Sequence, residues 1–378
     1  MPRRVLIVGA GLAGSRCAES LRAEGFDGGI VLIGDESRPP YERPALSKQF
    51  LAGESDGLEL RTARYWSERG IELALGRRVE SIDLLDRTAG GFAWDALVIA
   101  TGARPRRLPL AMPLGAHLLR SAEDAAGLRA ELVPGCRLVI VGAGFIGAEV
   151  ASTARARGVH VTLIDTAGSP LERVLGPEVG DLLAERYRGA GIDLRLRTGI
   201  RRFAAREGRI EGVELTDGTV VPCDAALVAV GVEAAAELVG EGPAGIPTDA
   251  CGRTEIPGVY ACGDVARWWR PSLGRHVRVE HWTSAAGQGV AVARAILGQA
   301  RPYDDTPYFW SDQFGLRLQH VGHAEEWAEV EIACEGETLC ARYLDGSGRL
   351  LAALLGNRPR DVAALRRELA PPLRPVPV

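Results

Sequence analysis

The chain has 378 residues, which exceeds one ordinary hydrophobic core, so two or three domains are expected. Its 46% hydrophobic and 25% charged residues are typical of a globular protein, and no apolar run approaches the ~20 residues that span a bilayer. The net charge of −4 gives no support for nucleic-acid binding. The seven scattered cysteines lack a C-x-x-C pair. They predict reduced thiols in a cytoplasmic protein, with no disulfide framework and no metal site.

One short pattern occurs twice: an apolar strand, a glycine turn and the start of a helix. The copies are VLIVGAGLAG at 5–14 and LVIVGAGFIG at 138–147. Such a turn lets the backbone approach a pyrophosphate, and the helix N-terminus supplies aimed N–H groups and the positive end of a dipole. One copy would be weak evidence. Two copies predict two dinucleotides in one protein, which suggests electron transfer between them.

The first copy opens a βαβ unit. We expect a helix over 13–23 and a strand over 30–33. The proline-rich segment 39–44 predicts a rigid loop, because proline fixes φ and cannot donate to a ladder. The apolar run 96–100 indicates a buried strand of a parallel sheet, ended by Thr-Gly-Ala-Arg-Pro.

The second copy repeats this organisation. A helix is expected over 148–157 and a strand over 159–164, with further strands at 192–196, 213–215 and 226–230. From about residue 302 the character changes, because aromatic residues cluster and polar and apolar residues alternate. That alternation predicts antiparallel strands and a third, α+β unit. The expected fold is therefore α/β, with two Rossmann-like units and a C-terminal α+β domain.

Asp165 indicates which dinucleotide the second unit binds. An acidic residue at the end of the second strand binds ribose hydroxyls, whereas an arginine there favours a 2′-phosphate. Asp165 follows the strand at the expected distance from the first glycine, and the next four residues, TAGS, carry no base. We interpret this as a preference for NAD(H) over NADP(H); the alternative is a solvated acid at a strand end. In the first unit, Asp35 and Glu36 are the candidates for the other ribose.

Further segments resemble one family. The loop PYERPALSK at 40–48, after Gly34-Asp35-Glu36, is similar to the FAD loop of the oxygenase-coupled NADH:ferredoxin reductases, which belong to the FAD-dependent pyridine nucleotide-disulfide oxidoreductase superfamily. The resemblance covers nearly the whole chain, in order. It continues through 100–102, 254–264, 279–282 and 309–314 and ends near 357–360.

The resemblance implies a glutathione-reductase type fold and an enzyme that passes electrons from NADH through FAD to a [2Fe–2S] ferredoxin. That ferredoxin, typically acidic, would serve a monooxygenase or a Rieske dioxygenase. We expect a cytoplasmic monomer or weak homodimer without a nucleic-acid or membrane partner. The implied domains are FAD-binding for 1–108 and 232–301, NAD-binding for 109–231 and a C-terminal α+β domain for 302–378.

The resemblance also implies site residues. The following are expected around FAD and the facing nicotinamide: Gly9, Gly11, Gly14, Asp35, Glu36, Arg43, Lys48, Ala100, Thr101, Gly102, Arg120, Gly263, Asp264, Glu280, His281, Trp282 and Trp310. The following are expected to line the NAD site: Gly142, Gly144, Phe145, Ile146, Gly147, Glu149, Asp165 and Gly231.

Lys48 and Glu149 are implied as a catalytic ion pair beside flavin N5. A buried lysine needs a partner, and a cation near N1 or N5 tunes the flavin potential. The alternative for this pair is a surface lysine and a solvated helix glutamate.

Several arginines are candidate basic patches for steering an acidic ferredoxin, although arginine is simply abundant in this chain. They are Arg104, Arg106, Arg107, Arg267, Arg270, Arg275 and Arg278. Trp268 and Trp269 either form an exposed patch for a partner or pack against the C-terminal domain.

The chain departs from the family pattern after Gly231. Glu233-Ala234-Ala235 stand where a Pro-Asn pair is usual, and the connection onward to Gly258 is shortened. This departure puts contacts at the domain junction in doubt. Two alternative functions use the same fold: an NADH oxidase or rubredoxin reductase, and an NADH-sensing interaction flavoprotein similar to apoptosis-inducing factor.

Overall fold

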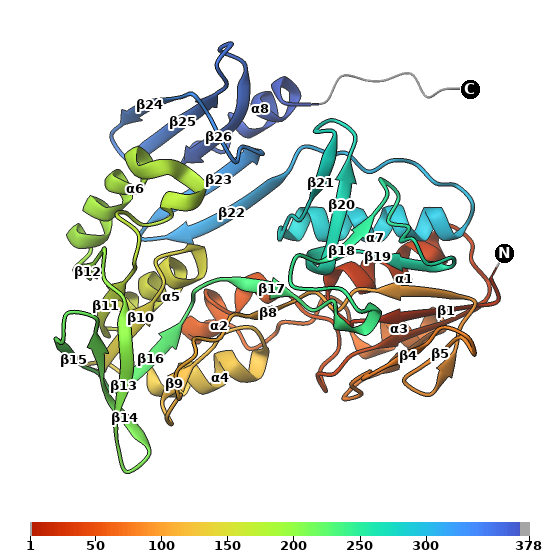
Figure 1. Cartoon of the computed structure of the whole chain (residues 1–378), viewed down its shortest axis with the longest axis horizontal. Helices are drawn as coiled ribbons and strands as arrows, with labels where there is room; N and C mark the ends of the chain where they lie inside the picture. Colours follow the sequence, from red (N-terminus) through yellow and green to blue (C-terminus); the bar gives the residue numbers. More distant parts are fainter. Residues whose placement is uncertain (1, 371–378) are drawn as a thin grey trace.

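The computed structural model describes residues 2–370, and its first unit is built on a parallel five-stranded sheet (Figure 1). Residues 5–7 in the middle of this sheet are fully buried, as expected for a strand covered on both faces. Helices α1 (Leu12–Ala23) and α7 (Trp282–Ile296) pack together beside it. Gly289 permits this close approach, because a Cβ there would lie 2.4 Å from the carbonyl oxygen of Ala13. In sheet order the strands are β19 (Val259–Ala261), β7 (Ala96–Ile99), β1 (Arg4–Val8), β2 (Gly29–Ile33) and β3 (Ile71–Ala74).

The second unit repeats the parallel arrangement. Strand β10 pairs with β11 and β16 just as β1 pairs with β2 and β7, so both glycine turns leave the central strand of a sheet. In sheet order the strands are β12 (Asp193–Arg195), β11 (His160–Ile164), β10 (Arg137–Val141), β16 (Ala225–Val228) and β9 (Ala116–His117). The helices are α4 (Ala122–Glu131), α5 (Phe145–Ala156) and α6 (Glu172–Gly189). An antiparallel sheet extends from this unit: β13 (Ile200–Arg206), β14 (Arg209–Leu215) and β15 (Val220–Pro222).

The C-terminal unit is an antiparallel five-stranded sheet. In sheet order its strands are β22 (Tyr308–Gln313), β23 (Leu316–Gly322), β26 (Leu350–Gly356), β25 (Thr338–Leu344) and β24 (Glu329–Glu335). Helix α8 (Val362–Glu368) contacts β23. Strand β22 packs against α5 of the second unit and against α7 of the first, so this sheet contacts both Rossmann-like units.

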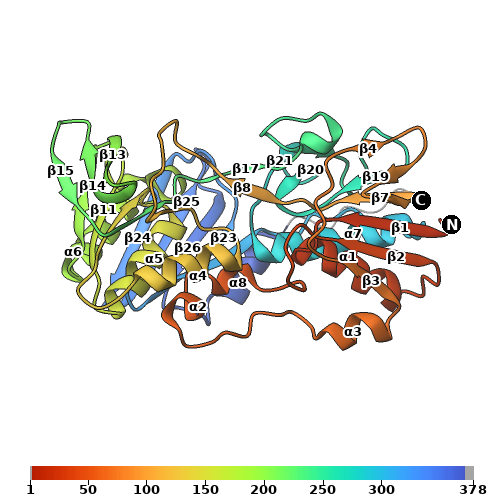
Figure 2. The same cartoon turned by 90° about the horizontal axis from the view of Figure 1, so that it is seen from below.

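Small elements complete the chain. The antiparallel pair β8 (Ala103–Pro105) and β17 (Val232–Ala234) runs between the two Rossmann-like units, which lie at opposite ends of an elongated molecule (Figures 1 and 2). The short helices are α2 (Gln49–Ala52) and α3 (Ala63–Glu68), with 3₁₀ turns η1 (Arg43–Ala45), η2 (Glu237–Val239) and η3 (Gly263–Val265). Two further sheets comprise β4 (Ile82–Asp83), β5 (Thr88–Ala89), β6 (Phe92–Ala93), β18 (Ile246–Thr248), β20 (Ala266–Arg270) and β21 (Arg275–Val277).

The predicted fold class is confirmed, and the differences lie at element ends. The helix expected over 148–157 begins already at Phe145, because Gly144 is its N-cap. The strand expected over 226–230 ends at Val228, before the turn at Gly231. Within residues 2–370, no helix combines the length and apolarity that a bilayer crossing requires.

Candidate cofactor site

A cavity of about 740 Å³ reaches both Rossmann-like units and the C-terminal sheet. Its size is within the range of small-molecule and cofactor sites. Most predicted site residues line it: Gly9, Gly11, Asp35, Glu36, Arg43, Lys48, Ala100, Thr101, Gly102, Arg120, Gly144, Phe145, Ile146, Glu149, Gly231, Gly263, Asp264, Glu280, His281, Trp282 and Trp310. Gly14, Gly142, Gly147 and Asp165 do not line this cavity.

The first glycine turn uses its three glycines in two ways. Gly9 has φ +118°, and a Cβ there would lie 2.1 Å from the carbonyl oxygen of Ala100. A Cβ on Gly14 would lie 2.1 Å from the carbonyl oxygen of Gly9. These two positions therefore need glycine for backbone packing. Around a Cβ on Gly11, by contrast, no atom of the described residues lies within 4 Å apart from Gly11 and its neighbours along the chain, so this position leaves open space for a ligand.

The second turn has the same division. A Cβ on Gly142 would lie 2.3 Å from the carbonyl oxygen of Ala229, and one on Gly147 would lie 2.0 Å from the carbonyl oxygen of Gly142. Around a Cβ on Gly144, no atom of the described chain lies within 4 Å apart from Gly144 and its neighbours along the chain. Gly11 and Gly144 are the N-caps of α1 and α5, and neither helix start has a side-chain cap within residues 2–370. Both cradles therefore fit a pyrophosphate that would accept the first N–H groups.

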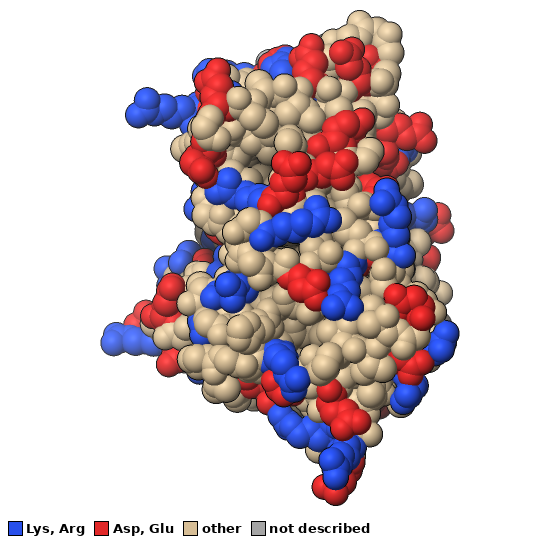
Figure 3. All heavy atoms as spheres, turned by 90° about the vertical axis from the view of Figure 1, so that its left-hand side faces the viewer, with Lys and Arg blue, Asp and Glu red and all other residues tan. Residues whose placement is uncertain are grey.

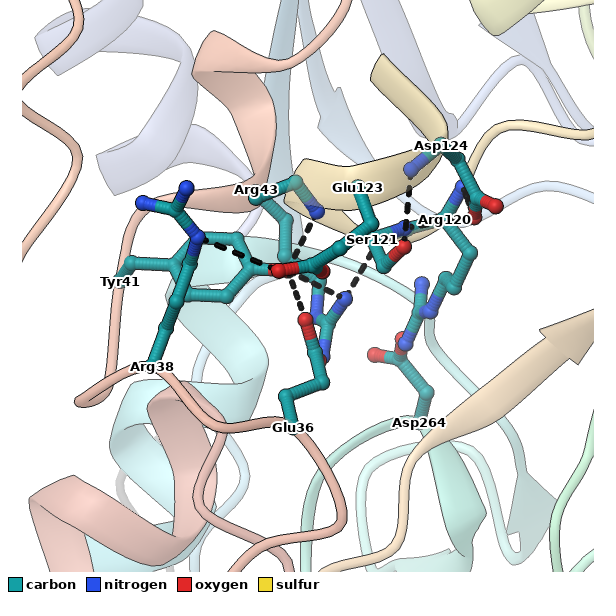
Figure 4. Close-up of polar contacts among 10 residues, drawn as sticks. Glu36, Arg38, Tyr41, Arg43, Arg120, Ser121, Glu123, Asp124 and Asp264 are labelled. Carbon is teal, nitrogen blue, oxygen red and sulfur yellow. Dashed lines mark hydrogen bonds and ion pairs between the residues drawn. The ribbon is translucent and has the colours of Figure 1, made fainter. Parts of the chain in front are cut away.

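A polar cluster holds the loop after β2 against the start of α4 (Figure 4). Arg43 Nη2 lies 2.5 Å from Glu36 Oε1, and the Tyr41 hydroxyl donates to Glu36 Oε2 at 2.6 Å. Arg43 also donates to the backbone carbonyl of Arg120 at 2.5 Å. Burial raises the pKa of Tyr41, so its hydroxyl stays protonated as a donor. Glu36 is therefore fixed beside the cavity, whereas Asp35 is exposed on its rim.

Asp264 and Arg120 both line the cavity, and their side chains point toward each other (Figure 4). Arg120 Nη2 donates to Asp264 Oδ2 at 3.1 Å. Asp264 belongs to the turn η3, which is anchored because the Gly263 N–H donates to Gln288 Oε1 of α7 at 2.8 Å. The carboxylate keeps acceptor capacity for hydroxyl groups of a ligand.

Lys48 and Glu149 come together in the structure. Lys48 Nζ lies 2.7 Å from Glu149 Oε2, and the side chains are 15% and 4% exposed. Ser47 donates to Oε2 at 2.5 Å and Ser311 donates to Oε1 at 2.7 Å. The Glu149 carboxylate thus joins the first unit, the second unit and β22 of the C-terminal sheet. Lys48 is also the only lysine in the sequence.

The serines of this network were missed by sequence reasoning. Ser47 adjoins Lys48, and Ser311 follows Trp310 in a segment that the family resemblance already covers. What the sequence did not reveal is that β22 packs on α5, which brings Ser311 to Glu149. A buried carboxylate requires several hydrogen-bond donors. Hydroxyl residues next to the predicted pair or its neighbouring segments were therefore the available signal.

A cluster of aromatic and histidine side chains lies where the cavity meets the C-terminal sheet. The Phe309 ring lies 4.4 Å from His281 and 5.1 Å from His320, measured between centroids, and the Trp282 and Trp310 rings lie 6.1 Å apart. Burial lowers the pKa of both His281 and His320 to about 3. The two imidazoles are therefore neutral at physiological pH.

This histidine pair predicts a loss of stability in acid. Below about pH 6.5 the unfolded chain protonates these histidines while the folded protein does not, so folding free energy is lost as pH falls from 6.5 toward 3. The loss approaches ~1.4 kcal/mol per pH unit for each histidine. We expect a lower denaturant midpoint at pH 5.0 than at pH 7.5. His320→Phe should reduce this difference and exposed His276→Phe should not; equal pH dependence of the two variants contradicts the assignment.

Asp165 lies at the end of β11, beside the second glycine turn. Its Oδ2 accepts the Ala143 N–H at 2.6 Å and its Oδ1 accepts the Ala167 N–H at 2.8 Å. The carboxylate is thus held in one orientation next to the cradle, where an acidic residue binds ribose hydroxyls in this type of unit.

The exposed-patch interpretation is wrong for Trp268 and Arg270. Trp268 is fully buried and donates to the carbonyl of Tyr303 at 3.1 Å, while Trp269 is 37% exposed. Arg270 is 2% exposed and pairs with Asp304 at 2.8 Å. Both results follow from the strand β20, in which neighbouring side chains face opposite sides.

Three other candidate arginines are neutralised by carboxylates in the structure. These ion pairs are Arg104 with Glu233 and Glu237, Arg275 with Glu325, and Arg278 with Glu280.

The junction after Gly231 is intact despite the unusual sequence there. Strand β17 pairs with β8, and the Thr101 hydroxyl donates to the carbonyl of Ala235 at 2.6 Å. The Ala235 N–H donates to the carbonyl of Gly102 at 3.0 Å. These bonds use the backbone of 233–235, so they do not depend on a Pro-Asn pair.

Comparison with known proteins agrees with this geometry. Residues 3–289 match the family model "Pyridine nucleotide-disulphide oxidoreductase", and residues 308–376 match "Reductase C-terminal". The chain belongs to the pyridine nucleotide-disulphide oxidoreductase family. This family member therefore binds FAD and NAD(H), and it joins that fold to a reductase C-terminal domain.

Its relatives include components of oxygenase systems. The chain is 38% identical over 380 residues to the ferredoxin--NAD(+) reductase component of the p-cumate 2,3-dioxygenase system of Pseudomonas putida, covering 96% of this chain and 92% of the relative. It is 36% identical to the corresponding biphenyl dioxygenase component of Paraburkholderia xenovorans, covering 95% and 91%. Among solved structures, putidaredoxin reductase in its covalent complex with putidaredoxin matches with a TM-score of 0.94 and 34% identity, covering 97% and 93%.

Proposed function

We propose that this protein is an NADH-dependent, FAD-containing reductase that delivers electrons to a [2Fe–2S] ferredoxin. The observation that carries the proposal is that two open glycine cradles, at Gly11 and Gly144, border one cavity. Two dinucleotides held there can meet end to end. FAD, when bound, would accept a hydride from NADH and release its two electrons one at a time. The relatives that are named ferredoxin--NAD(+) reductase components support the choice of acceptor.

The chain's own residues would supply binding and positioning. We assign 1–108 and 232–301 to FAD binding, 109–231 to NAD binding and 302–378 to the C-terminal domain. Asp264 would contact the ribityl chain of FAD and Arg120 would also contact FAD, while Asp165 would hold the adenosine ribose of NADH. Support for the FAD assignment comes from β19, a late segment that joins the sheet of β1 and β2.

Lys48 and Glu149 would lie beside the reacting end of the flavin. The ammonium supplies a positive charge next to the cavity, and the carboxylate with its two serine donors fixes the ammonium's position. The exclusive use of arginine elsewhere supports a specific need for lysine here. Lysine is a compact point charge on a flexible stem, whereas arginine is a planar fork with five donors.

The proposed partner is an acidic ferredoxin that serves a monooxygenase or Rieske dioxygenase in the cytoplasm. Complementary charge would favour a fast, weak encounter. Of the candidate arginines, Arg106, Arg107 and Arg267 form no ion pair with a carboxylate of residues 2–370. Arg106 and Arg107 are exposed and remain available for such a surface, whereas Arg267 is half-buried. We further propose a monomer or weak homodimer.

The test is NADH-driven reduction of cytochrome c with and without added [2Fe–2S] ferredoxin. The proposal expects cytochrome c reduction to depend on ferredoxin and NADH consumption to be slow without it. Rapid NADH consumption by O₂ alone would favour the NADH oxidase alternative. Slow turnover, a long-lived charge-transfer complex and NADH-dependent oligomerisation would favour the sensor alternative.

A further inference from the structure

An arginine from a distant part of the sequence lies beside the proposed ribose site. The loop after β12 is hydrogen-bonded to the loop after β11: the Asp165 N–H donates to the Arg195 carbonyl, the Arg197 N–H to the Ala167 carbonyl and the Thr198 N–H to the Asp165 carbonyl, each at 2.9 Å. The two loops therefore form one unit at the carboxyl end of the sheet, and Arg197 is part of it.

The Arg197 side chain is placed over the loop that follows Asp165. A Cβ on Gly168 would lie 3.0 Å from Arg197 Nη2, so the guanidinium covers this glycine. Arg197 itself has φ 53°, in the left-handed region that non-glycine residues seldom occupy. Within residues 2–370 no carboxylate forms an ion pair with the exposed Arg197, whereas neighbouring Arg195 pairs with Asp193 at 2.9 Å.

We infer that Arg197 forms a 2′-phosphate subsite, which lets the NAD-binding unit accept NADPH as a second, weaker substrate. The inference rests on the proposed role of Asp165, because a 2′-phosphate is attached to the ribose that Asp165 would hold. An arginine at this place supplies the cation that a 2′-phosphate requires, with a guanidinium fork matched to phosphate oxygens. The four residues after Asp165 include no basic side chain. Here the basic side chain is Arg197, in the loop that follows the neighbouring strand β12.

Two carboxylates make NADH the preferred substrate. Asp165 itself repels a 2′-phosphate. Glu172 Oε2 accepts the N–H groups of Gly168 and Ser169 at 2.6 and 2.9 Å. It would also lie 3.1 Å from a Cβ on Gly168, the position that lies 3.0 Å from Arg197 Nη2, so a second negative charge stands on the same side of Gly168 as the guanidinium. On the side of the molecule that contains α6 and β12, basic and acidic side chains are mixed (Figure 3). Recognition of a 2′-phosphate there would therefore depend on the local contact with Arg197 rather than on a broad basic field.

The experiment is titration of the oxidised holoenzyme with NAD⁺ and NADP⁺, which differ only in the 2′-phosphate. Arg197→Gln should raise the Kd of NADP⁺ about tenfold and leave that of NAD⁺ unchanged, as expected for loss of an exposed charge-assisted bond. Arg195→Gln is the matched control and should change neither value. Equal weakening of both ligands, or no change for either, would overturn the subsite.

A second variant separates this inference from the proposal for Asp165. Asp165→Asn should weaken NAD⁺ and tighten NADP⁺, and adding Arg197→Gln should remove the gain for NADP⁺. If Asp165→Asn leaves NAD⁺ affinity unchanged, the ribose role fails, while the selectivity of Arg197→Gln still decides the phosphate subsite. Neither measurement involves ferredoxin, so the choice of electron acceptor does not affect the result.

Discussion

Gly11→Val is expected to give a folded protein that lacks FAD. The backbone at Gly11 has φ −85° and ψ −169°, which valine adopts without strain, and within the described residues nothing lies within 4 Å of a Cβ there. The added side chain would instead occupy the space in which a pyrophosphate approaches the start of α1. The measurement is flavin absorbance of the purified protein, with circular dichroism to establish that it is folded.

Gly144→Val is the matched variant in the second unit. Its backbone is similar, with φ −77° and ψ −175°, and its Cβ space is equally open within residues 2–370. We expect a yellow protein that dithionite bleaches but NADH does not. A Gly11→Val protein with full flavin content would show that the first cradle does not hold FAD. Normal reduction of the Gly144→Val flavin by NADH would show that the second cradle does not hold NADH.

Lys48→Ala should slow anaerobic reduction of the flavin by NADH by a factor on the order of 10²–10³, the size of effect that follows removal of one preorganised hydrogen-bond donor at a reacting centre. The change removes the cation from the cavity wall. Within residues 2–370 it leaves the Glu149 carboxylate, 4% exposed, with Ser47 and Ser311 as its only side-chain donors. Stopped-flow absorbance measures the bleaching rate directly. Flavin content of the variant serves as the control for cofactor binding.

Lys48→Arg keeps the charge and tests why lysine is present. The Lys48 ammonium is a compact charge 2.7 Å from Glu149, and a planar guanidinium on a longer side chain would place its charge and its donors differently. We expect this variant to reduce slowly as well. If both variants reduce at the wild-type rate, Lys48 has no part in the reaction. If only Lys48→Arg does, the position requires a positive charge but not specifically lysine.

Local patterns explain why much of this site was predictable. The two glycine turns and the position of Asp165 directly after β11 depend on residues close in sequence, and both occur where the sequence predicts them, whereas the buried strands differ from the prediction at their ends. Ser311 was not predictable in this way, because its contact with Glu149 requires the C-terminal sheet to dock on α5. Arg197 was missed for the same reason: it reaches the loop after β11 from the loop that follows the neighbouring strand β12.

Composition without periodicity misplaces part of one strand. The basic residues around Trp268 and Arg270 suggest a surface position for both, yet both side chains are buried in β20. Side chains alternate between the two faces of a strand, so residues two apart lie on the same face. Trp268 and Arg270 are therefore both buried, while Trp269 between them is exposed. The segment ARWWR therefore predicts the burial of Trp268 and Arg270, but only if it is identified as a β-strand.

The sole lysine has a practical consequence for studying the protein in solution. Apart from the α-amino group, amine-directed reagents can modify one side chain, and it lies in the wall of the cofactor cavity. Acylation of Lys48 would remove the ammonium that faces Glu149. The extent of labelling, read by mass spectrometry, thus reports how far the bound cofactors shield this amine. Lysine-dependent cross-linkers, however, would be nearly blind to any complex with a partner.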